Sequence, residues 1–156
     1  MHDREIALRI YKATIKIYWE KLMKKKVLFL CIENSCRSQM AEGILRHLKG
    51  SKFEVFSAGI KPSVINPIAI KVMAEIGIDI SGHRSKSIDE FQGMNFDFVI
   101  TTCDGAREAC PVLPGKARHL HWSFNDPATV KGSEEEILSA FRKVRDEIML
   151  RIQKEF

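Results

Sequence analysis

The stretch that decides the fold is Val27-Leu-Phe-Leu-Cys-Ile-Glu-Asn-Ser-Cys-Arg-Ser38. It opens with six apolar residues in a row, a pattern typical of a strand that is buried on both faces of a parallel sheet. Apolar residues on one helical face then predict a helix over residues 39–48. The loop between them is therefore expected to join the carboxyl end of a buried strand to the N-terminus of a helix.

Strand and helix patterns alternate along the rest of the chain. Three further strands are expected, over residues 53–57, 96–101 and 118–122. Three further helices are expected, over residues 66–77, 87–91 and from 133 to at least 148. Asn66-Pro67 marks the start of the first of these, and Ser133 with Glu136 resembles a capping box. This alternation predicts a three-layer α/β/α sandwich around a parallel sheet.

The first 22 residues differ in character from the rest. Apolar and basic residues alternate there at helical spacing, which predicts an amphipathic helix. The apolar residues that recur at this spacing are Leu8, Tyr11, Ile15, Tyr18, Trp19 and Leu22. We therefore expect a helical extension, residues 1–22, and one domain, residues 23–156. The extension could pack on the domain or on a second copy of it, lie on a membrane surface, or be dispensable, with Met23 as the natural start.

Composition and charge exclude several classes of protein. The chain has 156 residues, which fits one domain with a sizeable core. No stretch approaches the roughly 20 apolar residues that a membrane span needs, and no signal peptide is recognisable. A cytoplasmic location is therefore expected. The net charge is +5, but Lys and Arg are spread along the chain, so no nucleic-acid partner is expected.

The cysteines stand at positions 31, 36, 103 and 110. Without a secretory signal, a structural disulfide framework is not expected. The spacing also lacks the paired CxxC arrangement of a structural zinc site. Nucleophilic or redox chemistry becomes the leading explanation. The histidines have no metal-ligand spacing, and His83 is expected to pack or cap, so no metal or organic cofactor is predicted.

The loop from Cys31 to Ser38 combines three elements of oxyanion chemistry. Unpaired N–H groups at a helix N-terminus bind anions, and Arg37 can clamp two oxygens of a tetrahedral anion. Cys31 faces the same N–H dipoles, which favour its thiolate. The hydroxyls of Ser35 and Ser38 are expected to stabilise that thiolate further. The loop therefore predicts a nucleophile, an anion cradle and a cation within eight residues.

The remaining loop residues are expected to bind the oxyanion or to hold the loop in shape. This group comprises Ile32, Glu33, Asn34, Ser35, Cys36 and Ser38. Asn34 tolerates left-handed backbone geometry and can tie the loop with its side chain. Cys36 is expected to be structural, although its neighbour Arg37 would favour a thiolate.

Residues 31–43 resemble the phosphate loop of the low-molecular-weight tyrosine phosphatase superfamily, and within it they are most similar to the thioredoxin-coupled arsenate reductases. The similarity runs from about Lys26 to the C-terminal helix. It includes Ser57-Ala-Gly59, Asn66-Pro67, Asp79-Ile80-Ser81 and Asp126-Pro127-Ala128. The resemblance implies a four-stranded parallel sheet and places only the N-terminal extension outside the shared fold.

The resemblance also implies a general acid. From the residues alone, an Asp-Pro pair in a loop is more typical of a turn. In both related families, however, an acid protonates the oxygen that departs when the thiolate attacks, and Asp126 resembles that acid. The phosphatases usually place an aromatic residue after this pair, to line a cleft for phosphotyrosine. Ala128 provides no such wall.

Two distant thiols favour the reductase. The resemblance implies that Cys103 attacks the Cys31–arsenate adduct and releases arsenite, and that Cys110 then attacks Cys103. A Cys103–Cys110 disulfide would remain for thioredoxin, or a similar dithiol protein, to reduce. The intervening residues, with Gly105 and Ala106, can form a short helix whose unwinding would bring the thiols together.

Two other functions remain open from the sequence. The first is a low-molecular-weight phosphatase for tyrosine phosphate or small phosphoesters, with Cys103 and Cys110 as bystanders. The second is a non-catalytic redox or anion-sensing module, with the N-terminal helix recruiting a partner. Intact Cys31, Arg37 and Asp126 together disfavour the second.

One position departs from the family pattern. Some of these reductases bind potassium near the loop, with residues that align with Asn34, Ser57, Arg84 and an acidic residue at Lys86. Here Arg84 and Lys86 are expected to put positive charge in that place, and like charges in one small site repel. We predict no potassium site, with Lys86 as a built-in cation that stiffens Asn34 and the loop. Ser57 and Lys86 are thus expected to support the site.

Overall fold

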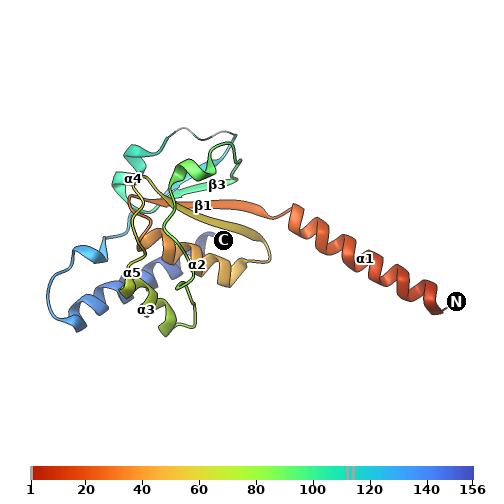
Figure 1. The fold of residues 1–156 in the computed structure, drawn as a ribbon, viewed down its shortest axis with the longest axis horizontal. Coiled ribbons are helices and arrows are strands. Elements are labelled where there is room, and N and C mark those ends of the chain that lie inside the picture. Colours follow the sequence, from red (N-terminus) through yellow and green to blue (C-terminus); the bar gives the residue numbers. More distant parts are fainter. Residues whose placement is uncertain (1, 112, 114) are drawn as a thin grey trace.

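The computed structural model describes residues 2–111, 113 and 115–156. Within them, four parallel strands form one sheet in the order β2-β1-β3-β4 (Figure 1). The strands are β1 (Lys25–Cys31), β2 (Phe53–Gly59), β3 (Phe98–Thr101) and β4 (Arg118–His121). Residues 27–31 of β1 are buried, because β1 has a neighbouring strand on each side and helices over both faces. The expected parallel sheet is confirmed.

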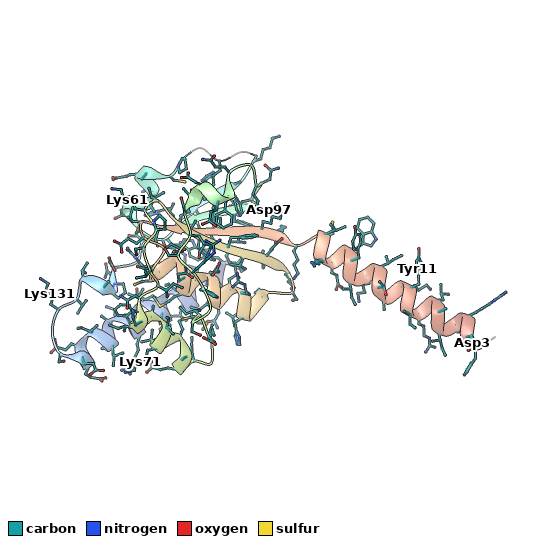
Figure 2. The ribbon with its side chains drawn as sticks, in the orientation of Figure 1. Asp3, Tyr11, Lys61, Lys71, Asp97 and Lys131 are labelled. Carbon is teal, nitrogen blue, oxygen red and sulfur yellow. The ribbon has the colours of Figure 1, made fainter. Side chains whose placement is uncertain are left out.

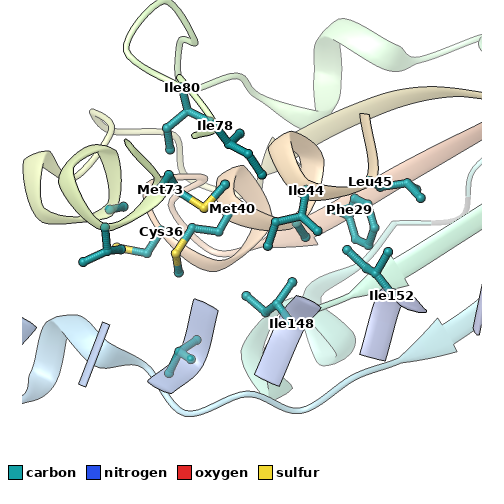
Figure 3. Packing of buried hydrophobic residues seen from close by; sticks show 14 of the residues in the cluster. Phe29, Cys36, Met40, Ile44, Leu45, Met73, Ile78, Ile80, Ile148 and Ile152 are labelled. Atoms are coloured by element: carbon teal, nitrogen blue, oxygen red, sulfur yellow. The ribbon is translucent and has the colours of Figure 1, made fainter. Parts of the chain in front are cut away.

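Helices cover the sheet unequally. The larger hydrophobic cluster joins one face to α2 (Arg37–Lys49), α3 (Pro67–Glu75) and α5 (Glu134–Glu155). Figure 3 shows this packing, with Phe29 of β1, Met40 and Ile44 of α2, and Ile148 of α5 in one apolar layer. A smaller cluster on the other face includes the 3₁₀-helix η1 (Ile88–Phe91) and α4 (Asp104–Ala109). The predicted three-layer α/β/α sandwich is therefore confirmed.

Short capping motifs start the helices where the sequence indicates. Asn66 Oδ1 accepts the N–H of Ile68 at 2.9 Å, and Pro67 occupies the first helical position of α3. Ser133 Oγ accepts the N–H of Glu136 at 3.2 Å at the start of α5. Such side-chain bonds satisfy N–H groups that have no partner within the helix.

Several element boundaries differ from the expected ones by one or two residues, among them the start of β3 and the end of α3. Strand β3 begins at Phe98 rather than at residue 96, because Asp97 instead binds the backbone of Lys26 through both its own N–H and its carboxylate. Phe96 packs edge-on against Phe56 in the smaller cluster. Helix α3 ends at Glu75 rather than at Gly77, where a positive φ of 77° breaks the helical path.

The predicted N-terminal helix is present as α1 (His2–Leu22) and has no buried residue. It projects away from the sheet in Figure 1, and Asp3 and Tyr11 lie far from the domain in Figure 2. The interpretation in which α1 packs on its own domain is therefore wrong, because the sheet and its helices already enclose the core without it. The other interpretations stay predictions. No helix in the described part of the chain is long and apolar enough to cross a membrane.

Candidate active site

The predicted loop lies between the carboxyl end of β1 and the N-terminus of α2. It forms one wall of a cavity of about 280 Å³. The cavity is lined by Cys31, Ile32, Glu33, Ser35, Cys36, Arg37, Asp126 and Ala128. The fold thus brings the Asp126 segment, some 90 residues further along the chain, to the loop that contains the expected nucleophile.

The backbone of the loop is oriented by the connection that follows β2. Backbone N–H groups of residues 60–66 donate, over 2.8–3.3 Å, to the carbonyls of Cys31, Ile32, Glu33 and Ser35. In a planar trans peptide the C=O and the next N–H point in opposite directions. Because these carbonyls point outward, the N–H groups that follow them point toward the cavity. This arrangement is the anion cradle that the sequence predicts.

Two donors meet the sulfur of Cys31. The Asn34 N–H donates to Cys31 Sγ at 3.1 Å, and Ser38 Oγ lies 2.8 Å from the same atom. Because Ser38 Oγ also accepts a hydrogen bond from Asn34 Nδ2 at 2.8 Å, its own proton is free to point at the sulfur. Two donors are thus aimed at one buried sulfur.

Asn34 ties the loop together, as its residue type suggests. It has a left-handed φ of 53° and is completely buried. Its Nδ2 also donates to Ser57 Oγ at 2.9 Å, and its Oδ1 accepts from Gln39 Nε2 and from the Lys86 N–H, each at 2.9 Å. The loop is therefore fixed by side chains and backbone from β2, α2 and the segment that precedes η1.

A buried ion pair lies behind this network. Lys86 Nζ is 3.7 Å from Glu42 Oε1 on α2, and it donates to the carbonyl of Arg84 at 3.0 Å. Burial alone would raise the pKa of Glu42, but the hydrogen bond from His83 and the charge of Lys86 outweigh it and hold that pKa below its usual range. Burial lowers the pKa of Lys86, against the opposing charge of Glu42. A positive charge thus lies next to the residues that position Asn34.

Arg84 and His83 have other roles than the sequence indicates. The guanidinium of Arg84 pairs with Glu90. The positive charges beside Glu42, behind the loop, are instead those of Lys86 and of Arg46, whose Nη2 lies 3.4 Å from Glu42 Oε1. His83 Nδ1 lies 2.9 Å from Glu42 Oε2 and 3.0 Å from Gln39 Oε1. His83 is therefore part of the polar network behind the loop rather than a simple packing residue. The absence of a potassium site stays a prediction.

Arg37 and Asp126 lie at the mouth of the cavity. Arg37 Nη1 donates to the carbonyl of Phe124 at 3.0 Å, and Nη2 lies 3.6 Å from Asp126 Oδ2. Asp126 also accepts the N–H of Ala128 at 3.0 Å, which orients its carboxylate. The side chain of Arg37 is largely buried and that of Asp126 partly exposed, and both line the cavity.

The fourth thiol, Cys36, lines the cavity but also packs into the larger hydrophobic cluster. Figure 3 shows it beside Met40 and Met73 in the larger cluster. Burial raises the pKa of the Cys36 thiol to about 12, which outweighs the charge of Arg37 and agrees with the structural role expected of it. The hydroxyl of Ser35 lies 3.7 Å from Cys36 Sγ and bonds that sulfur instead of Cys31, contrary to expectation.

The second pair of thiols lies beside the loop, at the ends of α4. Thr102 fixes their position, because its N–H and its hydroxyl both donate to the carbonyl of Leu30 at 2.8 Å. Thr102, which precedes Cys103, is thus bound to Leu30, which precedes Cys31. Cys31 and Cys103 belong to the same buried cluster. Cys110 ends α4 in a half-buried position, and burial raises its pKa. All four thiols are free.

Comparison with known proteins agrees with this geometry. The family described as low molecular weight phosphotyrosine protein phosphatase matches residues 26–155. The arsenate reductase of Halalkalibacterium halodurans is 48% identical over 130 residues, which is 83% of this chain and 94% of that protein. The chain belongs to this family, in its arsenate reductase branch.

Solved structures of this branch share the fold. An arsenate reductase in its phosphate-binding state has a TM-score of 0.69 and 37% identity, and the match covers 83% of this chain and 95% of that one. A thioredoxin-dependent arsenate reductase of Corynebacterium glutamicum has a TM-score of 0.57 and 31% identity, over 85% of this chain and 64% of that one. Residues 1–25 of this family member lie outside the family match.

Sequence reasoning missed three residues of the site in this family member. Gln39, Glu42 and His83 form the polar network behind the loop. Gln39 and Glu42 follow Arg37 at helical spacing, so the sequence places them only on the same helix. No local pattern pairs them with His83, some 40 residues further along the chain. Glu42 alone carries a signal, since a carboxylate on the core-facing side of a helix requires a partner.

Proposed function

We propose that this chain reduces arsenate to arsenite through a relay of Cys31, Cys103 and Cys110, with thioredoxin or a similar dithiol protein as the reductant, in the cytoplasm. The proposal rests chiefly on the position of α4, which presents two further thiols next to the oxyanion loop. Hydrolysis of a phosphoester would need no such thiols. Reduction of arsenate needs two electrons, and a pair of thiols can provide them.

In the first step, the loop binds arsenate through its inward N–H groups and the guanidinium of Arg37. The Cys31 thiolate attacks arsenic, and Asp126 protonates the departing oxygen, which leaves as water. A sulfur–arsenic bond forms and an arsenic–oxygen bond breaks, with arsenic still in the +5 state. The partly exposed carboxyl of Asp126, close to Arg37, is suitably placed for this proton transfer.

In the second step, the Cys103 thiolate attacks Cys31 Sγ. The sulfur–arsenic bond breaks and its electron pair stays on arsenic. Arsenite leaves, and a Cys31–Cys103 disulfide remains on the protein. Cys110 then attacks Cys103 Sγ, which forms Cys103–Cys110 and returns Cys31 as a thiolate. An external dithiol reduces the final disulfide. The thioredoxin dependence of the Corynebacterium glutamicum relative supports thioredoxin as that dithiol.

The cavity wall also favours the reductase over the phosphatase. Ala128 lines the cavity after Asp126-Pro127, where an aromatic side chain would be needed to flank the ring of a phosphotyrosine. The small side chain of Ala128 suits an inorganic oxyanion, which has no ring to be flanked.

We also propose that residues 23–156 form the catalytic domain and that the extension, residues 1–22, takes no part in the reaction. The residues of the relay, the loop and the network behind it all lie within residues 31–126. The family match, which begins at residue 26, supports the same division.

A coupled assay distinguishes the two reactions. Thioredoxin, thioredoxin reductase and NADPH are supplied with the protein, and NADPH oxidation is followed with and without arsenate, beside hydrolysis of an aryl phosphate. We expect arsenate-dependent oxidation that is lost in Cys31→Ser, Cys103→Ser and Cys110→Ser alike. Fast hydrolysis that survives Cys103→Ser, without arsenate-dependent oxidation, would establish the phosphatase instead.

A further inference from the structure

A hydrogen-bonded contact ties α4 to the neighbouring strand. Asp104, the first residue of α4, places its Oδ1 2.8 Å from His121 Nε2 at the end of β4. The Nδ1 atom of the same ring lies 2.7 Å from Thr101 Oγ1, at the end of β3. Ser123 Oγ donates to Asp104 Oδ1 at 3.3 Å. We call the Asp104–His121 contact the α4 clasp.

The protons of the α4 clasp follow from its partners. The hydrogen bond from His121 holds the pKa of Asp104 below its usual range, so the carboxylate only accepts and Nε2 must carry the proton. The Nδ1 atom can accept from the Thr101 hydroxyl or donate to it. The contact is therefore kept whether His121 is neutral or protonated. Its ring is mostly buried, which limits its rotation.

Helix α4 must open before its two thiols can bond. Cys103 and Cys110 cap its two ends, so seven helical steps of 1.5 Å would separate them by about 10 Å along the axis. A disulfide requires Cα atoms about 5.5–6 Å apart. A hollow of about 680 Å³, lined by Arg107, Cys110 and His121 among others, lies beside α4 and gives the opened turn space.

We propose that Asp104 and His121 are positioning residues that keep α4 folded while Cys103 reacts, and so set when Cys110 can attack. The proposal rests on the relay proposed above. In the resting state, Cys103 Sγ also accepts the N–H of Ala106 at 3.4 Å and caps α4. Once Cys103 is bonded to Cys31, its sulfur is part of a disulfide and is a poorer acceptor. The α4 clasp is then the main polar contact between the start of α4 and the sheet.

Loss of the clasp should favour the open helix modestly. Asp104 is exposed, and exposed ion pairs change an equilibrium by about 1.5- to 5-fold. We therefore expect the Cys31–Cys103 disulfide to be converted to Cys103–Cys110 about 1.5 to 5 times faster in Asp104→Ala. Arsenite is released before this conversion, so the rate of arsenite release should not rise in Asp104→Ala.

The test is a single turnover of the full chain with arsenate, stopped by acid and alkylation at a series of times. Mass spectrometry then gives the amounts of the two disulfides in the wild type, Asp104→Ala, His121→Leu and the double variant. We expect both single variants to shorten the lifetime of Cys31–Cys103, and the double variant to shorten it no further, because both remove one contact. Asp104→Asn, which keeps an acceptor for Nε2–H, should have a smaller effect.

Glu108→Ala is the matched control, since it removes another exposed carboxylate from α4. Asp104→Ala keeps the test decisive if His121→Leu does not fold, because Asp104 lies at the surface. An unchanged or longer lifetime in Asp104→Ala, or an equal change in Glu108→Ala, would overturn the role of the clasp. Absence of any Cys31–Cys103 disulfide and of arsenite in the wild type would instead refute the relay itself.

Discussion

At the scale of single residues, the reactivity of Cys31 depends on the hydrogen bonds that its sulfur accepts. Ser38 is central, because it accepts from Asn34 Nδ2 and thereby directs its own proton at Cys31 Sγ. A hydrogen bond to a charged group contributes more than one between neutral groups. The loop thus fixes the position of the Cys31 sulfur before any substrate binds.

We predict that Ser38→Ala lowers kcat/KM for arsenate about 10- to 100-fold, the value of one hydrogen bond to a charged group. Ser139→Ala, which changes an exposed serine on α5, is the control. An unchanged kcat/KM for arsenate in Ser38→Ala would contradict the role given to this hydroxyl.

Glu42 makes the stability of the protein depend on pH. Its pKa is held low in the folded protein, so the unfolded chain binds more protons in mildly acidic solution, and stability falls as the pH drops. This contribution is complete above the ordinary pKa of a glutamate and is lost as pH falls through the lowered value. We predict that Glu42→Gln destabilises the protein by about 1–3 kcal/mol at neutral pH, since it leaves Lys86 without its counter-charge.

The measurement is urea unfolding of the wild type and Glu42→Gln between pH 7 and pH 3. The difference between their free energies of unfolding should shrink as the pH falls. Glu108→Gln, at an exposed position of α4, should follow the wild type. A difference in free energy of unfolding that stays constant with pH would show that Lys86 and His83 do not stabilise the charge of Glu42.

The sequence predicts the reactive residues better than their supports. Cys31, Arg37 and the left-handed Asn34 follow from local geometry, because a strand-to-helix turn dictates where their groups point. The contact between Glu42 and Lys86 follows from no local rule. It depends on how α2 packs against the segment before η1, which only the folded chain determines.

At the scale of elements, the loop can approach β2 only because Gly59 has no side chain. A Cβ atom there would lie 2.7 Å from the carbonyl oxygen of Ile32 and 2.8 Å from the amide nitrogen of Asn34. Both are backbone atoms of the cradle, so neither can yield without moving it. The end of β2 thus holds the anion loop at a fixed distance.

We predict that Gly59→Ala destabilises the protein by about 1–3 kcal/mol, the usual range for an overpacked site, and also abolishes most of the activity. Gly82→Ala is the control, because a Cβ at Gly82 meets no atom within 4 Å. Thermal unfolding and the coupled assay measure the two effects. A Gly59→Ala protein with wild-type Tm and activity would contradict this account of the loop.

Elements were predictable where a local signal starts or stops them. Asn66 and Ser133 cap helices as their residue types indicate, and the apolar run of β1 is buried as expected. The start of β3 was not predictable. It depends on the hydrogen bond between Asp97 and Lys26 of the neighbouring strand, and no residue near position 97 indicates that contact.

At the scale of the whole molecule, the catalytic domain encloses its core without α1. The buried residues belong to the described part of the chain after Met23, and none belongs to α1. We predict that removal of residues 1–22 leaves Tm and kcat/KM for arsenate unchanged within experimental error. Sedimentation velocity of both forms then shows whether the exposed apolar residues of α1 join two copies. A large fall in Tm of the truncated protein under conditions where both forms are monomeric would contradict this division.

The central claim is that electrons pass from Cys103 and Cys110 to the arsenate bound at Cys31. Its most direct test is the disulfide pattern of Cys110→Ser after one turnover with arsenate, mapped by mass spectrometry beside the wild type. We predict a trapped Cys31–Cys103 disulfide with one equivalent of arsenite in the variant, and Cys103–Cys110 in the wild type. Reduced cysteines in both proteins after incubation with arsenate would contradict the claim.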